Sequence, residues 1–250
     1  MNTIFEFTDR TSVYSKCIFA SICHAVMVGK YTLLSDEISW DGTSFLFQNM
    51  EGTRGVISFS EKNFLCGIQS EENYLEGENN IENTLLKDAE LDIIYRVREE
   101  IFPYLLVEND GIENTLLKDA ELDIIYRVRE EIFPYLLVEN DGDDIPAISA
   151  IFWGEEEKIC SDMNEKEFMH KSDNILLPYL YEEKDMKKYW RDYYEMNQEH
   201  EQIVEELYLK KMTNDSFLLD AVQKEKLMEW FGEEITYCKQ SLEEIGIMFD

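Results

Sequence analysis

The chain has 250 residues, of which 44% are hydrophobic and 13% aromatic, so it can bury a sizeable core and is not disordered as a whole. Its 54 Asp and Glu residues oppose 23 Lys and Arg residues, which gives a net charge of −31. This charge repels nucleic acid and anionic membranes, so we expect neither as a partner. The acids either serve only to keep the protein soluble or attract a basic partner protein, which is the partner we expect.

The first 80 residues predict a helix packed on a small antiparallel β-meander. Apolar residues recur at helical spacing over 13–28, with Thr11 or Ser12 as the N-cap and Gly29 as the end of the helix. Short β-prone runs separated by glycine turns, including Asp41-Gly42, then predict strands at 31–35, 44–48, 55–60 and 63–69.

The cysteines and the apolar run at 17–28 predict a cytoplasmic location. The run is too short to span a bilayer, and no basic segment precedes it, so we expect no membrane helix and no secretory signal. The five cysteines are an odd number without a CxxC pair, which is typical of reduced thiols. They are Cys17, Cys23, Cys66, Cys160 and Cys238.

A perfect tandem repeat follows a polar loop at 71–80. The 31 residues of 81–111 recur without a substitution at 112–142. Each copy predicts one amphipathic helix that ends at a proline, Pro103 in the first copy and Pro134 in the second. Perfect identity indicates a recent in-frame duplication rather than a solenoid, whose repeats diverge. We therefore expect one copy to fill a single place in the fold and the other to add one helix.

The last region, residues 143–250, predicts short strands and then helices. Strands are expected at 145–153 and 158–163, followed by a helical stretch at 165–181 that is broken by Pro178. A long helix at 185–212 and a second at 218–245, joined by a polar turn, are expected to pair as an antiparallel hairpin. The predicted class is α+β with three regions, at 1–80, 81–142 and 143–250.

No motif in the sequence predicts a catalytic, cofactor or metal site. Cys23 and His24 are neighbours, so on a helix their side chains point about 100° apart and do not face each other as a nucleophile and base. His200 falls on an apolar helical stripe, which indicates a packing or hydrogen-bonding role between helices rather than a ligand. The carboxylates at 141–144 lack the spacing of a calcium loop, and no phosphate-binding loop is present.

Tyrosines lie among carboxylates between 189 and 208, and aromatic anchors beside acidic groups are suited to gripping a basic protein surface. We expect Tyr194 and Tyr208 to be exposed there. The residues expected to bind a partner are Tyr189, Asp192, Tyr194, Glu195, Glu199, Glu201, Glu205 and Tyr208. The leading hypothesis is a non-enzymatic binding protein that occupies a basic, nucleic-acid-binding surface of its partner, as immunity proteins, antitoxins and anti-defence proteins do.

Two other hypotheses remain open from the sequence. One is an enzyme with an unrecognised acid/base or thiol site in a cleft between the meander and the helices. The other is a structural protein in which the extra duplicated helix mediates homodimerisation.

Overall fold

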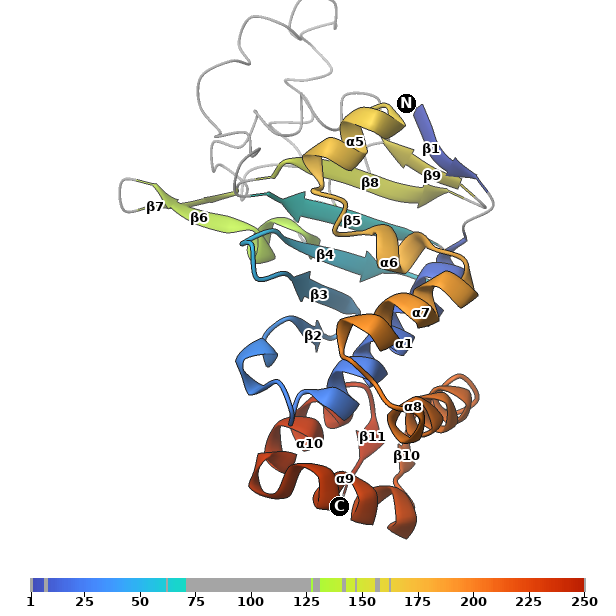
Figure 1. Ribbon diagram of the computed structural model, residues 1–250. Helices are drawn as coiled ribbons and strands as arrows, with labels where there is room; N and C mark the ends of the chain where they lie inside the picture. The colour runs from blue at the N-terminus through green and yellow to red at the C-terminus, as the bar shows by residue number, and fades with distance from the viewer. Residues whose placement is uncertain are drawn as a thin grey trace, which may run out of the picture.

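The protein is described by a computed structural model (Figure 1). It describes residues 2–6, 9–61, 63–70, 127, 131–140, 143–146, 148–155, 158–161 and 163–249. The first copy of the repeat lies outside these residues. So does the helix predicted in the second copy, apart from Arg127 and residues 131–133.

One antiparallel sheet of seven strands organises the fold, in the spatial order β1-β9-β8-β5-β4-β3-β2 (Figure 1). Each strand pairs with neighbours that run in the opposite direction. The strands are β1 (Asn2–Glu6), β2 (Ile38–Asp41), β3 (Ser44–Gln48), β4 (Arg54–Phe59), β5 (Phe64–Gln69), β8 (Ala150–Glu155) and β9 (Lys158–Ser161). Since β8 and β9 join the strands of the N-terminal meander, the first and last predicted regions share one sheet.

Helix α1 (Arg10–Met27) lies across one face of this sheet, which we call the inner face (Figure 1). Nearly every residue from Cys17 onward is buried, because the helix has the sheet on one side and later helices on the other. The Trp40 ring N–H donates to Ser21 Oγ at 2.8 Å, which fixes the edge strand β2 against α1. The N-cap is Asp9, which accepts from the Ser12 backbone, so the prediction of Thr11 or Ser12 as cap is off by two or three residues.

The meander forms largely as predicted, with one error. Strands β3, β4 and β5 coincide with three of the four expected runs, and Gly42 at φ 58° makes the turn between β2 and β3. The run at 31–35 instead forms a 3-10 turn, η1 (Thr32–Leu34), in which Leu33 is 98% exposed. This run has no strand partner left, because Ile38–Asp41 already supplies the edge of the sheet.

The described end of the second copy lies against the opposite, outer face of the sheet. Residues 131–137 include the short helix η2 (Phe133–Tyr135) and contact the face that carries Ser58 and Gly67. The chain then makes a separate hairpin from β6 (Leu137–Asn140) and β7 (Asp143–Pro146) and returns to the sheet at β8.

The C-terminal region is helical, as predicted, but more finely divided. Pro178 begins a helix instead of breaking one, because proline fits the first turn, where its missing N–H costs nothing. Gly232 at φ 55° ends one helix, so the expected helix at 218–245 is two. The elements are α5 (Glu165–Lys171), α6 (Leu177–Leu180), α7 (Glu183–Tyr193), α8 (Gln198–Lys211), β10 (Phe217–Leu218), α9 (Ala221–Phe231), η3 (Gly232–Glu234), α10 (Ile235–Glu244) and β11 (Ile247–Met248).

The α+β class is confirmed, with an N-terminal helix, an antiparallel sheet and a set of helices that ends in a C-terminal pair. In the described part of the chain, no helix is both long and apolar enough to cross a membrane.

Candidate partner-binding surface

The predicted partner-binding residues do not lie on one helix. The expected helix at 185–212 is interrupted after Tyr194, where Glu195 takes φ 47° and Asn197 begins α8. The Asn197 side chain accepts from the backbone of Glu199 and His200, and the His200 ring accepts from the backbone of Asn197 in return. This capping box explains the break, and it gives His200 the structural role that the sequence indicated.

Tyr194 was predicted to be exposed, and this prediction is wrong. Its side chain is 0% exposed, stacks on Trp190 with ring centroids 5.9 Å apart, and places its hydroxyl 3.0 Å from His24 Nδ1. Burial raises the pKa of Tyr194 well above its usual value. Tyr194 lies four residues after Trp190 and eight after Met186, so it continues the buried face of α7 into the core, where it cannot meet a partner.

The other predicted residues keep at least partial exposure, but several already have internal partners. Lys187 contacts Glu205 at 2.9 Å, and Lys30 lies 3.6 Å from Glu195. Tyr208 is half-buried with its ring edge-on to Phe19 at 5.2 Å. Asp192 pairs with the neighbouring Arg191, and Tyr189 is 37% exposed beside Tyr193. Glu199 is exposed, and Glu201 is half-exposed.

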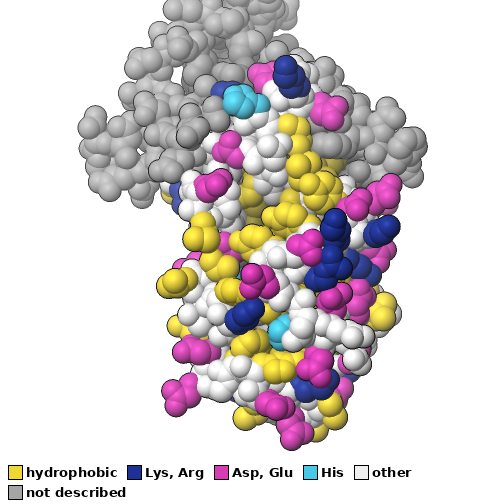
Figure 2. Space-filling view, viewed as in Figure 1, with side chains coloured by type: hydrophobic (Ala, Val, Ile, Leu, Met, Phe, Trp, Pro, Cys, Tyr) yellow, Lys and Arg dark blue, Asp and Glu magenta, His cyan; other side chains and the backbone are white. Residues whose placement is uncertain are grey.

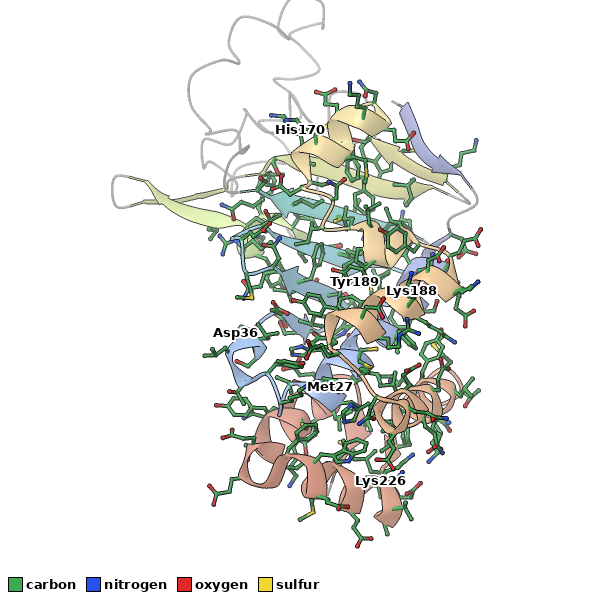
Figure 3. The ribbon with its side chains drawn as sticks, viewed as in Figure 1. Met27, Asp36, His170, Lys188, Tyr189 and Lys226 are labelled. Carbon is green, nitrogen blue, oxygen red and sulfur yellow. The ribbon has the colours of Figure 1, made fainter. Side chains whose placement is uncertain are left out.

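Helix α7 is also not acidic. It carries four bases, Lys184, Lys187, Lys188 and Arg191, against three acids, Glu183, Asp185 and Asp192. Figure 2 shows these basic side chains gathered over α7, and Figure 3 shows Lys188 and Tyr189 on that helix. A basic partner would meet local repulsion here, so the acidic surface has to be sought from α8 onward.

Exposed apolar side chains gather on the elements that follow α7. Leu218 on β10 and Met248 on β11 are register partners in a two-stranded parallel sheet and are 60% and 45% exposed. Exposed apolar side chains also end α8 and begin α9. We define the C-terminal patch as Leu209, Met212, Leu218, Val222 and Met248. The sequence pattern does not predict this patch, because strands of two residues show no alternation of apolar and polar side chains.

Polar contacts hold the elements of the C-terminal patch together. Lys210 Nζ lies 3.2 Å from Asp220 Oδ2, which joins the end of α8 to the start of α9. Lys211 Nζ donates to the Asp215 backbone oxygen, beside the turn that leads into β11. These contacts fix the ends of α8 and α9 and the turn before β10 relative to one another.

Exposed acidic side chains predominate on the elements that carry the C-terminal patch, and we call them its acidic surround. Residues 198–250 contain 13 acids and 5 bases, a net charge of −8. The four lysines on α8 and α9 are partly buried, whereas Glu206, Asp215, Asp220, Glu225 and Glu229 are exposed. Over α9, hydrophobic and acidic side chains lie next to each other (Figure 2). The combination suits a partner with apolar side chains set in a basic surface.

A cavity of about 330 Å³ lies between α1, the β2–β3 turn and the segment after α10. The guanidinium of Arg10 lies 5.5 Å from the ring centroid of Tyr14 and 5.6 Å from that of Phe59. Glu244 accepts from the Trp40 backbone at 3.1 Å, and burial raises the pKa of Glu244. The cavity therefore brings cationic, acidic and aromatic groups together between the meander and the helices.

The thiols and His24 are core groups. Cys17, Cys23 and Cys66 are fully buried, and burial raises the pKa of each thiol well above its usual value. Burial also lowers the pKa of His24 to about 4. A neutral thiol without solvent access is a poor nucleophile, so Cys23→Ala would report on packing rather than on catalysis.

His24 makes the stability of the fold depend on pH. It takes up a proton near pH 6.5 when unfolded but only near pH 4 when folded, so stability is complete above pH 6.5 and falls below it. Between pH 6.5 and pH 5 the free energy of unfolding should fall by about 1.5 kcal/mol. Urea unfolding across this range measures the loss. An imidazole NMR signal of His24 that titrates near pH 6.5 in the folded protein would contradict it.

Within the described residues, no three His, Cys, Asp or Glu side chains are grouped in a way that would hold a metal ion. Comparisons with known proteins give no family for the chain: no protein-family model, no curated protein and no solved structure matches it significantly.

Proposed function

We propose that the chain is a non-enzymatic binding protein of the cytoplasm that occupies a basic surface of a partner protein through the C-terminal patch and its acidic surround. The observation that carries the proposal is the exposed pair Leu218 and Met248, set among exposed carboxylates. Apolar anchors supply affinity once water is excluded, and the surrounding charge orients the partner and speeds its approach.

The proposed mode of binding is the one predicted from the sequence, but the binding surface lies at the C-terminal patch and not at residues 189–208. Of the residues first expected to bind, Glu199 and Glu201 lie on α8 and extend the acidic surround, while Tyr194 is removed by burial. A basic surface that is complementary to this region is also one suited to phosphate backbones, so occupation by this chain would block nucleic-acid binding, as immunity proteins, antitoxins and anti-defence proteins do.

Affinity capture tests the proposal. The tagged protein is incubated at low salt with lysate of the organism that encodes it, and bound proteins are eluted with a salt gradient and identified by mass spectrometry. We expect one stoichiometric basic protein that elutes at moderate salt and is not captured by a Leu218→Ser/Met248→Ser variant. Capture that is equal for the variant and the wild type would contradict the assignment of the surface.

The cavity beside Arg10 favours a second function, the binding of a small anion with an aromatic ring. Arg10 supplies a cation, and Tyr14, Trp40 and Phe59 supply ring faces. A panel of aromatic carboxylic acids, titrated against tryptophan fluorescence, would detect it. A saturable change that is lost in Arg10→Gln would support this function and the related enzyme hypothesis, and no saturable change would remove both.

A further inference from the structure

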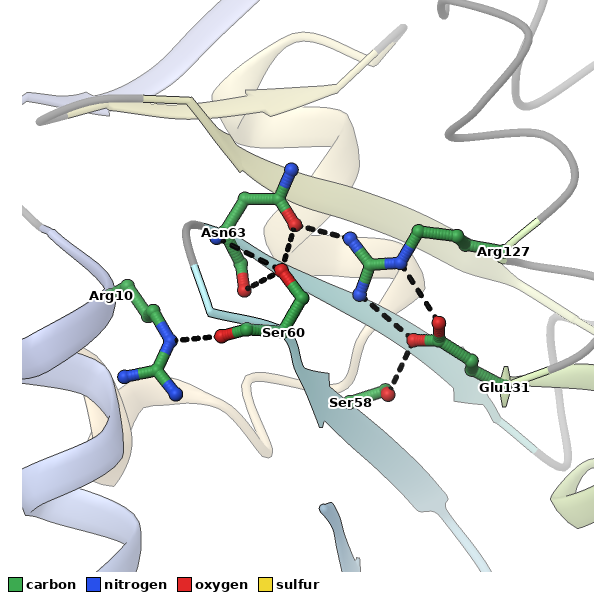
Figure 4. A network of polar contacts seen from close by, with 6 residues as sticks. All are labelled: Arg10, Ser58, Ser60, Asn63, Arg127 and Glu131. Carbon is green, nitrogen blue, oxygen red and sulfur yellow. Dashed lines mark hydrogen bonds and ion pairs between the residues drawn. The ribbon is translucent and has the colours of Figure 1, made fainter.

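The second copy of the repeat is attached to the outer face of the sheet by a polar network (Figure 4). Arg127 donates twice to Glu131, at 2.9 Å and 2.8 Å, and also donates to Asn63 Oδ1. Glu131 Oε2 in turn accepts from Ser58 Oγ at 2.5 Å. Both ends of the Arg127–Glu131 pair are therefore bound to β4 and to the turn before β5.

Apolar contacts complete the attachment. Ile132 and Leu136 are buried against Gly67 of β5, where an added Cβ atom would lie 2.2 Å from Ile132 Cγ2 and 3.1 Å from Leu136 Cδ1. Tyr135 donates to Asp41 at 3.0 Å, and Arg54 donates to the Leu137 backbone oxygen at 2.5 Å. The sheet thus contacts both the side chains and the backbone of this segment.

Electrostatics at Glu131 favour the attached state at neutral pH. Burial alone would raise the pKa of Glu131, but the hydrogen bonds from Arg127 and Ser58 outweigh it and hold the pKa below its usual value. The carboxylate is consequently charged and fully paired in the interface.

The segment 127–137, RVREEIFPYLL, has an identical counterpart at 96–106. Every side chain that contacts the outer face is present there, with Arg96, Glu100, Ile101 and Leu105 in the places of Arg127, Glu131, Ile132 and Leu136. One docking surface therefore faces two chemically identical ligands in the same chain.

We propose that the outer face of the sheet is a docking surface for this eleven-residue sequence, and that residues 96–106 occupy it in exchange with 127–137. The contacts made by the eleven residues are the same in both states, so the two states differ in energy only through the segments that flank the docked sequence. Loop-closure cost grows with the logarithm of loop length, which limits this difference to roughly 1 kcal/mol.

One feature outside the repeat favours the second copy. Strand β7, which pairs with β6, begins after the repeat ends, and the first copy is followed by a different sequence, 112–115. The β6–β7 hairpin is a separate two-stranded sheet, and such hairpins add little stability in water. It therefore biases the exchange without preventing it.

Exchange of the two segments takes place within one molecule. Each chain carries two docking segments and one surface, and that surface is filled from within the chain. A second molecule offers no vacant surface, so exchange within one chain does not require a dimer.

Copy-specific substitutions test the exchange. Ile132→Glu and Ile101→Glu each place a charge in one segment, and the other segment then docks in its place. We expect each single variant to lower the melting temperature by less than about 3 °C and the double variant to lower it by about 10 °C or more. Lys87→Glu with Lys118→Glu is the control, because it adds negative charge to both copies outside the eleven residues.

Deletion of Ile112–Gly142 supplies a second test. Because the copies are identical, deletion of the first copy would give the same product. The melting temperature of this product should be close to that of the wild type. In this background Ile101→Glu alone should be as damaging as the double variant is in the full chain.

Three results would overturn the proposal. The first is a loss from Ile132→Glu alone that equals the loss from the double variant. The second is a double variant no less stable than either single variant. The third is a wild-type dimer in sedimentation that becomes a monomer on deletion, which would assign the spare segment to a second copy of the chain.

Discussion

Replacement of both Leu218 and Met248 with serine is expected to weaken the complex with the basic partner protein by at least about 100-fold. The two side chains are register partners on β10 and β11 and present adjacent apolar surface. Truncation of buried interface anchors commonly costs about 2 kcal/mol or more each, and 1.4 kcal/mol is a factor of ten in affinity. The change is measured as the dissociation constant, by calorimetry with the captured partner.

The fold should survive this change, because both side chains are largely exposed and serine keeps the backbone pairing of β10 and β11. Leu33→Ser with Met50→Ser is the matched control, since these side chains are 98% and 83% exposed and lie outside the C-terminal patch. If the control weakened binding as much as the patch variant, the patch would not be the binding surface.

Gly67→Val is expected to lower the free energy of unfolding by about 3 kcal/mol. The new side chain would occupy the space of Ile132 on the outer face, and forcing extra atoms into a packed contact typically costs about 2 kcal/mol. Displacement of the Ile132 side chain from the surface adds about 1.5 kcal/mol of lost burial. Urea unfolding at pH 7 measures the change.

This substitution acts on the surface and so affects docking of either copy of the repeat, unlike Ile132→Glu. Ile101→Ala with Ile132→Ala, which removes the clashing methyl group from both copies, should reduce the cost of Gly67→Val. An unchanged cost in that background would mean that the loss arises within β5 and not at the docked segment.

The sequence was informative where one periodic pattern decides the structure. The apolar spacing at 13–28 and the β-prone runs at 44–48 and 55–60 correctly predicted α1, β3 and β4. Local preference and tertiary packing agree in these elements. At 31–35 the preference was similar, but Ile38–Asp41 takes the edge of the sheet, so the run became a 3-10 turn.

The errors at the binding surface have a local cause. Asn197 and His200 form a capping box that starts a new helix, and Tyr194 closes the preceding helix on the same buried face as Met186 and Trp190. The helical stripe at 185–212 continues across this point, so periodicity alone hides the break. An Asn three residues before a hydrogen-bonding side chain was the available signal.

The C-terminal patch and the docking surface depend on contacts between distant segments. Leu218 meets Met248, and Gly67 meets Ile132, only after the chain has folded. The repeat showed that two segments are equivalent, whereas the structure showed what one of them binds.

The most direct test of the proposed function is the dissociation constant of the purified complex as a function of salt. Between about 0.1 M and 1 M salt the Debye length falls from about 10 Å to about 3 Å, which screens the acidic surround of the C-terminal patch. We predict that the dissociation constant rises steeply over this range for the wild type. A dissociation constant that does not change with salt would contradict the account, because the acidic surface would then play no part in binding.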